Sequence, residues 1–156
     1  MKILGIDIGY DGGMVVINSE DRTIVWFSNI PTYTIMQGKK KRRKYDISEI
    51  CTLIQTKVTI DHAVLEQLHA FPKQGGVSNF STGYGAGMYE GILTSLEILY
   101  EKVTPQAWKK HFSLLKQTKH ASVQKANELL GMNLKKTQDG IAEAALLALY
   151  IIRRRL

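Results

Sequence analysis

The stretch "MKILGIDIGYDGG" (residues 1–13) joins an apolar strand pattern to a glycine-rich end and carries one acid, Asp7, within the strand. Side chains alternate along a strand, so Asp7 shares a face with Ile3 and Gly5. An ionised carboxylate in such a place is costly unless it is paired or binds a metal. Two more β-patterned runs follow, "GMVVIN" (13–18) and "TIVWFS" (23–28). Turn signals separate the runs, which predicts a three-stranded antiparallel meander.

The middle of the chain begins with a polar, basic stretch over 30–44, for which we expect a loop. An amphipathic helix is predicted over 46–55, with Asp46 or Ser48 as its N-cap. The run "HAVLEQL" (62–68) then predicts a fourth strand.

The second half alternates helix and strand patterns. A helix over 79–95 precedes a strand over 97–103, and a short helix follows with Thr104 as its cap. A further helix ends at Gly131, and the last helix, over 138–154, is apolar nearly all round after its first turn. The predicted fold is α/β, with a mixed five-stranded sheet covered by helices on both faces. This order points toward the ribonuclease H-like layout.

Length and composition predict a single domain over 1–156, since 44% of the residues are hydrophobic and no composition break divides the chain. No signal-peptide pattern and no membrane-spanning run is found, and the lone cysteine, Cys51, fits a reducing cytoplasm. The formal net charge is +7, and much of the excess lies in "KKKRRK" (39–44) and "RRR" (153–155). Such clusters favour a polyanionic partner, although solvated surface segments are the plain alternative.

Four acids suggest a metal site. Glu66 lies inside the apolar run "AVLEQL", as Asp7 does in the first strand. Asp139 and Glu143 are four residues apart at the start of the last helix, so they project from one helical face. A charge preference at a helix N-terminus is the alternative for this pair. Together the four carboxylates form the oxygen-only ligand set that Mg²⁺ or Mn²⁺ prefers, and two such ions can hydrolyse a phosphodiester. The nearby glycines 9, 12 and 13 are expected to let the backbone approach a substrate closely.

Four blocks in order resemble the RuvC-type Holliday-junction resolvases, particularly their phage-encoded branch: "GIDIG" (5–9), "VLEQLHAFPKQGGVSNFSTGYGAG" (64–87), "VTPQAWKKHF" (103–112) and "DGIAEAALLA" (139–148). The resemblance covers most of the chain. It implies a ribonuclease H-like fold, a homodimer, and two Mg²⁺ ions per site, which Mn²⁺ can replace. It further implies paired symmetric nicks in four-way DNA junctions during recombination and repair, in the cytoplasm of a bacterial host for a phage protein.

The resemblance also implies the roles of the acids. Asp7 matches the first-strand acid of the family, Glu66 the fourth-strand acid and Glu143 the last acid, which is usually aspartate. The family's remaining acid stands three residues before the last one, where this chain has Gly140. Asp139, four residues before Glu143, takes its place as the expected ligand because this spacing still fits one helical face.

Contacts to DNA are expected from three segments: the basic stretch with Lys40, Lys41, Arg42 and Arg43, the loop after Glu66 with Phe71, Lys73 and Gln74, and the pair Lys109 and Lys110. Phe71 and Phe80 are each either wedges for an opened junction or core residues. Trp108 is interpreted as core. The four histidines have no ligand spacing.

A homodimer is expected through the helix over 79–95, where Gly83, Gly87 and Gly91 form a flat stripe that permits close helix packing. Other functions remain open. One is a broader nuclease on branched DNA or structured RNA, and another is a DNA-binding module without catalysis. An actin-like or sugar-kinase ATPase opens with a similar glycine-rich strand, but needs two lobes and a longer chain. No nucleotide cofactor and no membrane partner are expected.

Overall fold

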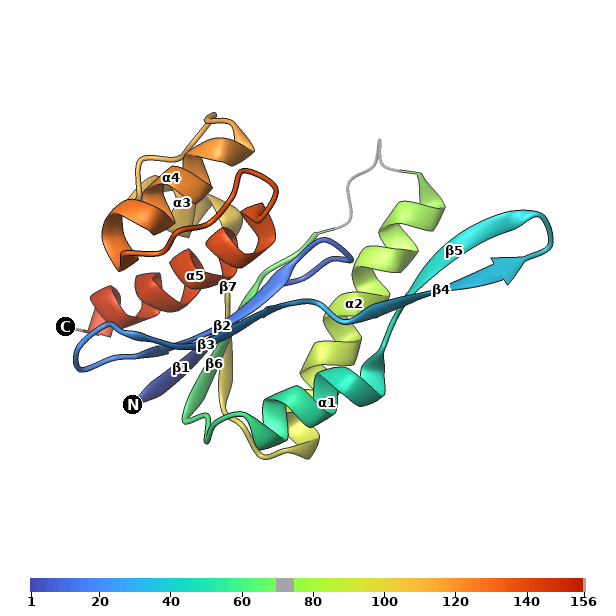
Figure 1. Cartoon of the computed structure of the whole chain (residues 1–156), viewed down its shortest axis with the longest axis horizontal. Coiled ribbons are helices and arrows are strands. Elements are labelled where there is room, and N and C mark those ends of the chain that lie inside the picture. The colour runs from blue at the N-terminus through green and yellow to red at the C-terminus, as the bar shows by residue number, and fades with distance from the viewer. Residues whose placement is uncertain (70–74, 156) are drawn as a thin grey trace.

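The computed structural model describes residues 1–69 and 75–155. Its centre is a five-stranded sheet in the order β3-β2-β1-β6-β7 (Figure 1). The strands are β1 (Lys2–Asp7), β2 (Gly13–Asn18), β3 (Ile24–Asn29), β6 (His62–Glu66) and β7 (Tyr100–Val103). The first three pair antiparallel, whereas β6 pairs parallel with both β1 and β7. The predicted meander and the mixed α/β sheet are confirmed.

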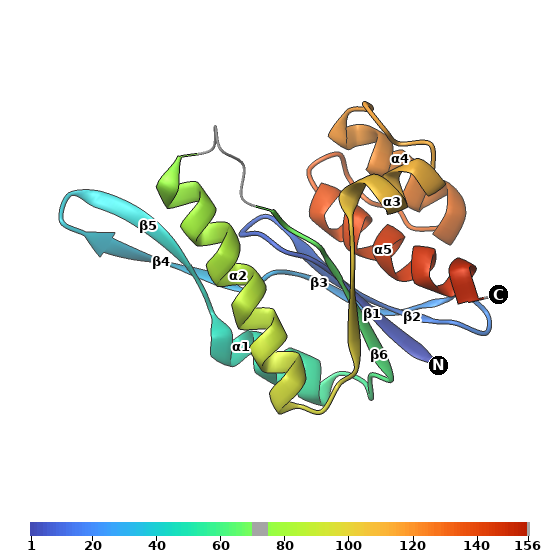
Figure 2. The same cartoon turned by 180° about the vertical axis from the view of Figure 1, so that it is seen from behind.

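Two helical layers cover the sheet, one on each face (Figures 1 and 2). On one face lie α3 (Pro105–His111), α4 (Lys119–Leu130) and α5 (Asp139–Arg155), and on the other lie α1 (Ile47–Thr56) and α2 (Gly76–Ser95). Alternation along the strands supplies two cores: Ile3 packs into the α5 layer, and Leu4 into the layer of α1 and α2. Helix α5 is buried along most of its length, as its apolar sequence predicts.

Helix ends follow local chemistry. The Asp46 side chain accepts the backbone N–H of Glu49 at 3.0 Å and caps α1. Thr104 caps α3 through the N–H of Ala107 at 3.2 Å, with Pro105 in the first turn. Gly131 ends α4 in the left-handed region, at φ 62°. These three features were predicted from the sequence.

The prediction of a loop over 30–44 is wrong. The segment forms a two-stranded antiparallel ribbon of β4 (Thr32–Gln37) and β5 (Lys40–Tyr45), separate from the main sheet, with a turn at Gly38. Both strands are exposed over most of their length, and the basic strand β5 has no apolar alternation that would mark it as a strand. Three boundaries also differ by two residues or more, since α2 begins at Gly76, β6 ends at Glu66 and β7 begins only at Tyr100.

Within the described part of the chain, no helix is long and apolar enough to cross a membrane.

Candidate active site

Two acids lie side by side where parallel strands end. Asp7 ends β1 and Glu66 ends β6, and the last residues paired before them are Ile6 and Leu65. Parallel strands end at the same edge of the sheet, so both carboxylates lie at this edge. The strand pattern places them there because each acid comes one residue after a fully buried position.

Helix α5 adds Asp139 and Glu143 to this edge. Burial raises the pKa of Asp7 well above its ordinary value, and the charges of Glu143, Glu66 and Asp139 raise it further, in that order. Lys109 acts in the opposite direction. The four predicted acids therefore interact as one electrostatic group, although they come from three separate elements.

Close backbone packing excludes an acid at position 140. A Cβ on Gly140 would lie 2.3 Å from the carbonyl oxygen of Asp11 and 2.6 Å from the backbone of Gly12, so no side chain fits there. Gly12 and Gly140 form a β-bridge at this point. Asp139 is one residue away from this close contact, and its carboxylate still acts on Asp7.

Within residues 1–69 and 75–155, three of the four carboxylates, those of Glu66, Glu143 and Asp139, have a side-chain hydrogen bond or ion pair. The indole Nε1–H of Trp108 donates to Glu66 Oε1 at 2.9 Å, and the Ser122 hydroxyl donates to Glu143 Oε1 at 3.1 Å. Lys109 Nζ lies 3.6 Å from Glu143 Oε1. Burial raises the pKa of Glu66, and the indole hydrogen bond opposes this rise. Each of these donors stabilises the ionised form of its acid.

The third of these acids, Asp139, pairs with Lys119, whose Nζ lies 3.2 Å from Oδ2. This hydrogen bond and the charge of Asp139 raise the pKa of Lys119. A cavity of about 270 Å³ opens between the loop after β1 and the start of α5, and Asp7, Asp139, Glu143 and Lys119 line it. The site is therefore accessible from solvent at the carboxyl edge of the sheet.

The oxygen atoms of the four carboxylates are suitable ligands for a divalent cation. Four carboxylates face two ammonium groups, and the rise in the pKa of Asp7 shows that its negative charge is poorly compensated. Within residues 1–69 and 75–155, no three His, Cys, Asp or Glu side chains are grouped closely enough to hold a metal ion. Glu66 contacts Trp108, Asp139 contacts Lys119, and Glu143 contacts Ser122 and Lys109.

Solved structures share this architecture at low sequence identity. Thermus thermophilus RuvC in complex with a Holliday junction substrate has a TM-score of 0.67 at 12% identity, covering 99% of this chain and 95% of RuvC. The fowlpox virus Holliday junction resolvase has 0.59 at 15%, with 99% of both chains covered. The yeast mitochondrial resolvase has 0.57 at 14%, covering 97% of this chain and 77% of its own.

The chain has the RuvC-type resolvase fold. No protein-family model and no curated sequence matches it. The resemblance in fold is thus carried by the three-dimensional arrangement, and the expected ribonuclease H-like class is confirmed.

Within this RuvC-type fold, the predicted DNA contacts lie in different surroundings. Lys110 is exposed on α3, whereas Lys109 is half-buried against Glu143 and the Trp108 ring. Arg43 is bonded within the chain to Asp11. Phe71, Lys73 and Gln74 lie outside the described residues. The basic residues of β5 other than Arg43 are considered below.

Two interpretations require correction. Glycines 9, 12 and 13 were expected to let the backbone approach a substrate closely, but the space beside Gly12 and Gly13 is filled by the protein's own backbone. A Cβ on Gly13 would lie 2.7 Å from Ile141 of α5, and one on Gly12 would lie 2.0 Å from the Asp7 carbonyl oxygen. Phe80 is not a core residue, since 74% of it is exposed on α2.

Sequence reasoning missed Trp108, Ser122 and Lys119 as partners of the acids. Trp108 is fully buried, as predicted, but its indole N–H also reaches the site. A signal was present in the sequence: "TPQAWKK" directly follows β7, and its capped helix starts beside the strand that carries Glu66. No comparable local signal marks Ser122 or Lys119, which come from α4 and the residues at its start.

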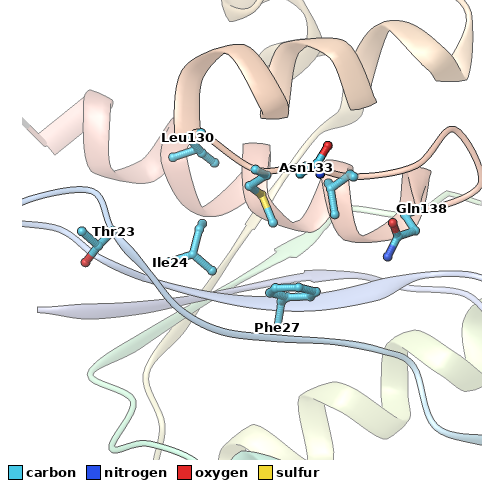
Figure 3. A pocket seen from close by; sticks show the side chains of 9 residues that line it. Thr23, Ile24, Phe27, Leu130, Asn133 and Gln138 are labelled. Carbon is cyan, nitrogen blue, oxygen red and sulfur yellow. The ribbon is translucent and has the colours of Figure 1, made fainter.

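A second cavity, of about 430 Å³, lies away from the acids, between β3 and the loop that joins α4 to α5 (Figure 3). Its lining is mainly apolar and includes Ile24, Phe27, Leu130 and Met132. None of the four carboxylates lines it. We therefore assign this cavity no part in the chemistry of the candidate active site.

Proposed function

We propose that the chain is a metal-dependent endonuclease that resolves four-way DNA junctions by paired symmetric nicks. The observation that carries the proposal is the single electrostatic group of Asp7, Glu66, Asp139 and Glu143 at the carboxyl edge of a RuvC-type sheet. The names of the solved structures support the substrate, because they describe RuvC and a fowlpox virus enzyme with Holliday junction DNA.

The four carboxylates would hold the metal, which we propose to be two Mg²⁺ ions, with Mn²⁺ as a substitute. When bound, such ions supply an activated water and stabilise the leaving oxygen of a phosphodiester. Asp139 and Glu143 would then turn from their ammonium partners toward the ions, whereas Glu66 would keep its hydrogen bond to Trp108. Until then, Lys109 pairs with Glu143 and Lys119 pairs with Asp139.

The Trp108 hydrogen bond takes only one oxygen of Glu66, Oε1. The second oxygen is left for the metal. Lys109 Nζ lies over the same indole ring, 5.0 Å from its centre, so α3 presents two adjacent side chains to two different acids. This arrangement holds the acids without making either of them unavailable.

We further propose a homodimer through α2, because paired nicks need two sites with two-fold symmetry. The outer side of α2 exposes Val77, Phe80 and Tyr84 at helical spacing. Gly83, Gly87 and Gly91 continue this side, and a Cβ on any of them would meet no described heavy atom within 4 Å. The one charged residue of α2, Glu90, contacts Lys102 and Tyr100, so the exposed stripe carries no charge. Such a surface can pack closely against its own copy.

The test compares four substrates of matched sequence: a labelled four-way junction, a three-way junction, a flap and a linear duplex. Each is incubated with Mg²⁺, with Mn²⁺ and with EDTA, and the cuts are mapped on both strands. Symmetric nicks on the four-way junction, absent in EDTA, are expected. Equal cutting of flaps or of structured RNA would instead establish a broader branched-substrate nuclease, and binding without cutting would establish a non-catalytic module.

A further inference from the structure

The β4–β5 ribbon extends away from the body of the molecule, beside the end of the sheet that carries the acids (Figures 1 and 2). Residues 39–44 supply six consecutive Lys or Arg side chains, and no acid lies between residues 31 and 45. The charge is confined to one strand, since β4 (Thr32–Gln37) has no charged residue. The ribbon therefore has one strongly cationic edge.

The face of β5 that carries Arg43 and Tyr45 is fixed to the body. Tyr45 is buried, and its ring centre lies 4.5 Å from that of Tyr10. Arg43 Nη1 donates to Asp11 Oδ1 at 2.6 Å, and Nη2 donates to the Tyr10 carbonyl. Both partners belong to the loop that follows Asp7. The ribbon is thus anchored to the catalytic edge at its base.

The opposite face of β5 is free. Side chains alternate along a strand, so Lys40, Arg42 and Lys44 lie together on the face away from Arg43. All three are exposed, and among the described residues none of their side chains has a hydrogen bond or ion pair. They recur about every 6.7 Å, twice the rise of a strand, which is comparable to the spacing of successive phosphates along a nucleic-acid strand.

We propose that this ribbon is an arm that holds one duplex arm of the junction, with Lys40, Arg42 and Lys44 on successive phosphates of one DNA strand. The proposal rests on the proposed function for its choice of branched DNA. Arg43 and Tyr45 serve as the anchor and not as DNA contacts, which revises the expectation that Arg43 binds DNA. Because phosphates carry no sequence information, the arm raises affinity equally on all sequences and sets where the duplex enters the site.

The experiment compares two triple variants that lose the same charge. The outer-face variant is Lys40→Ser, Arg42→Ser and Lys44→Ser. The control is Lys57→Ser, Lys135→Ser and Lys136→Ser, all exposed positions outside the ribbon. Binding to a linear duplex and to a four-way junction is measured in EDTA as a function of salt. Each phosphate contact contributes about 0.9 to the slope of log affinity against log salt, so the outer-face variant should lose roughly 2 to 3 units.

The control should keep the wild-type slope, and an outer-face variant that folds and matches the control would overturn the proposal. If the triple variant does not fold, the three single substitutions are measured, each with an expected loss of about 0.9. Three folded single variants with unchanged slopes would overturn it equally. Binding to anionic phospholipid vesicles as tight as to duplex would also overturn it, by favouring a membrane surface.

The two proposals fail separately. A wild-type protein that cuts no junction disproves the proposed function, while the slope on linear duplex still tests the arm. A wild-type protein that cuts junctions, with no slope difference between the two triple variants, disproves the arm alone.

Discussion

The indole Nε1–H of Trp108 donates to Glu66 Oε1 at 2.9 Å, across 42 positions of sequence. Trp108 is fully buried, and its ring packs in the core on the α5 side of the sheet. The same side chain therefore fills the core and orients a carboxylate of the candidate site. A buried donor aimed at a carboxylate fixes one rotamer of that acid before any ligand arrives.

Trp108→Phe should separate these two roles, because phenylalanine keeps most of the ring packing and removes the donor. We expect a folded protein in which cleavage falls by about 10- to 100-fold, the usual cost of losing an outer partner of a metal ligand. The Mg²⁺ concentration for half-maximal cutting should rise, and Mn²⁺ binding measured by calorimetry should weaken. Trp26→Phe, on β3, is the matched control. Weakened melting with unchanged metal dependence would assign Trp108 to the core alone.

Asp7→Asn, Glu66→Gln and Glu143→Gln should each reduce cutting by more than about 100-fold, beyond the loss expected for an outer partner. Junction binding should persist, because each change removes a negative charge that repels phosphate. Asp139→Asn tests whether Asp139 takes the role of the family's acid, whose position is occupied by Gly140 in this chain. Cleavage rates and binding are measured on the same labelled junction. Near wild-type turnover in any variant would remove that residue from the site.

Asp7 should make the metal-free protein less stable as pH rises. Its folded pKa is raised, so between the unfolded value of about 3.9 and the raised value the folded state binds more protons than the unfolded state. The contribution of Asp7 to stability is then fully present below its pKa in the unfolded state. It is lost as the pH rises through its pKa in the folded state. Asp7→Asn should therefore melt higher than wild type at pH 8 in EDTA, by about 2–4 °C for each kcal/mol relieved.

The gain from Asp7→Asn should shrink as the pH falls toward 4.5, which melting curves across this range will check. Asp21→Asn is the control of opposite sign, because hydrogen bonds from Thr23 lower the pKa of Asp21. It should show no gain at pH 8. A pH-independent difference for Asp7→Asn would contradict the burial of its charge.

Gly87→Glu should abolish the proposed dimer. Its Cβ enters open space beside α2, so the fold should be kept, while two glutamates would meet across the symmetric helix pair. Light scattering at micromolar concentration is expected to change from dimer to monomer mass. Gln55→Glu adds the same charge to an exposed position on α1 and should leave the dimer intact. A wild-type monomer, with or without junction DNA, would exclude this interface.

The sequence by itself predicted the meander, the central sheet and the helices. It did so because the spacing of apolar residues indicates which face of a strand or helix is buried. It also indicated Asp7 and Glu66, since an acid in an apolar strand stands out against its neighbours. The β4–β5 ribbon was missed for the converse reason. Its basic strand is exposed on both faces, and a strand without a buried face has no alternation to detect.

Only the tertiary structure decided which partners the acids have. Trp108 reaches Glu66, Ser122 reaches Glu143 and Lys119 reaches Asp139 because α3 and α4 pack beside α5, and such long-range contacts leave no periodic trace in the sequence. The exclusion of a side chain at Gly140 likewise depends on the carbonyl oxygen of Asp11, more than a hundred residues away in the chain. Local patterns determined which surfaces are buried, whereas the distances between functional groups arose only when those surfaces packed together.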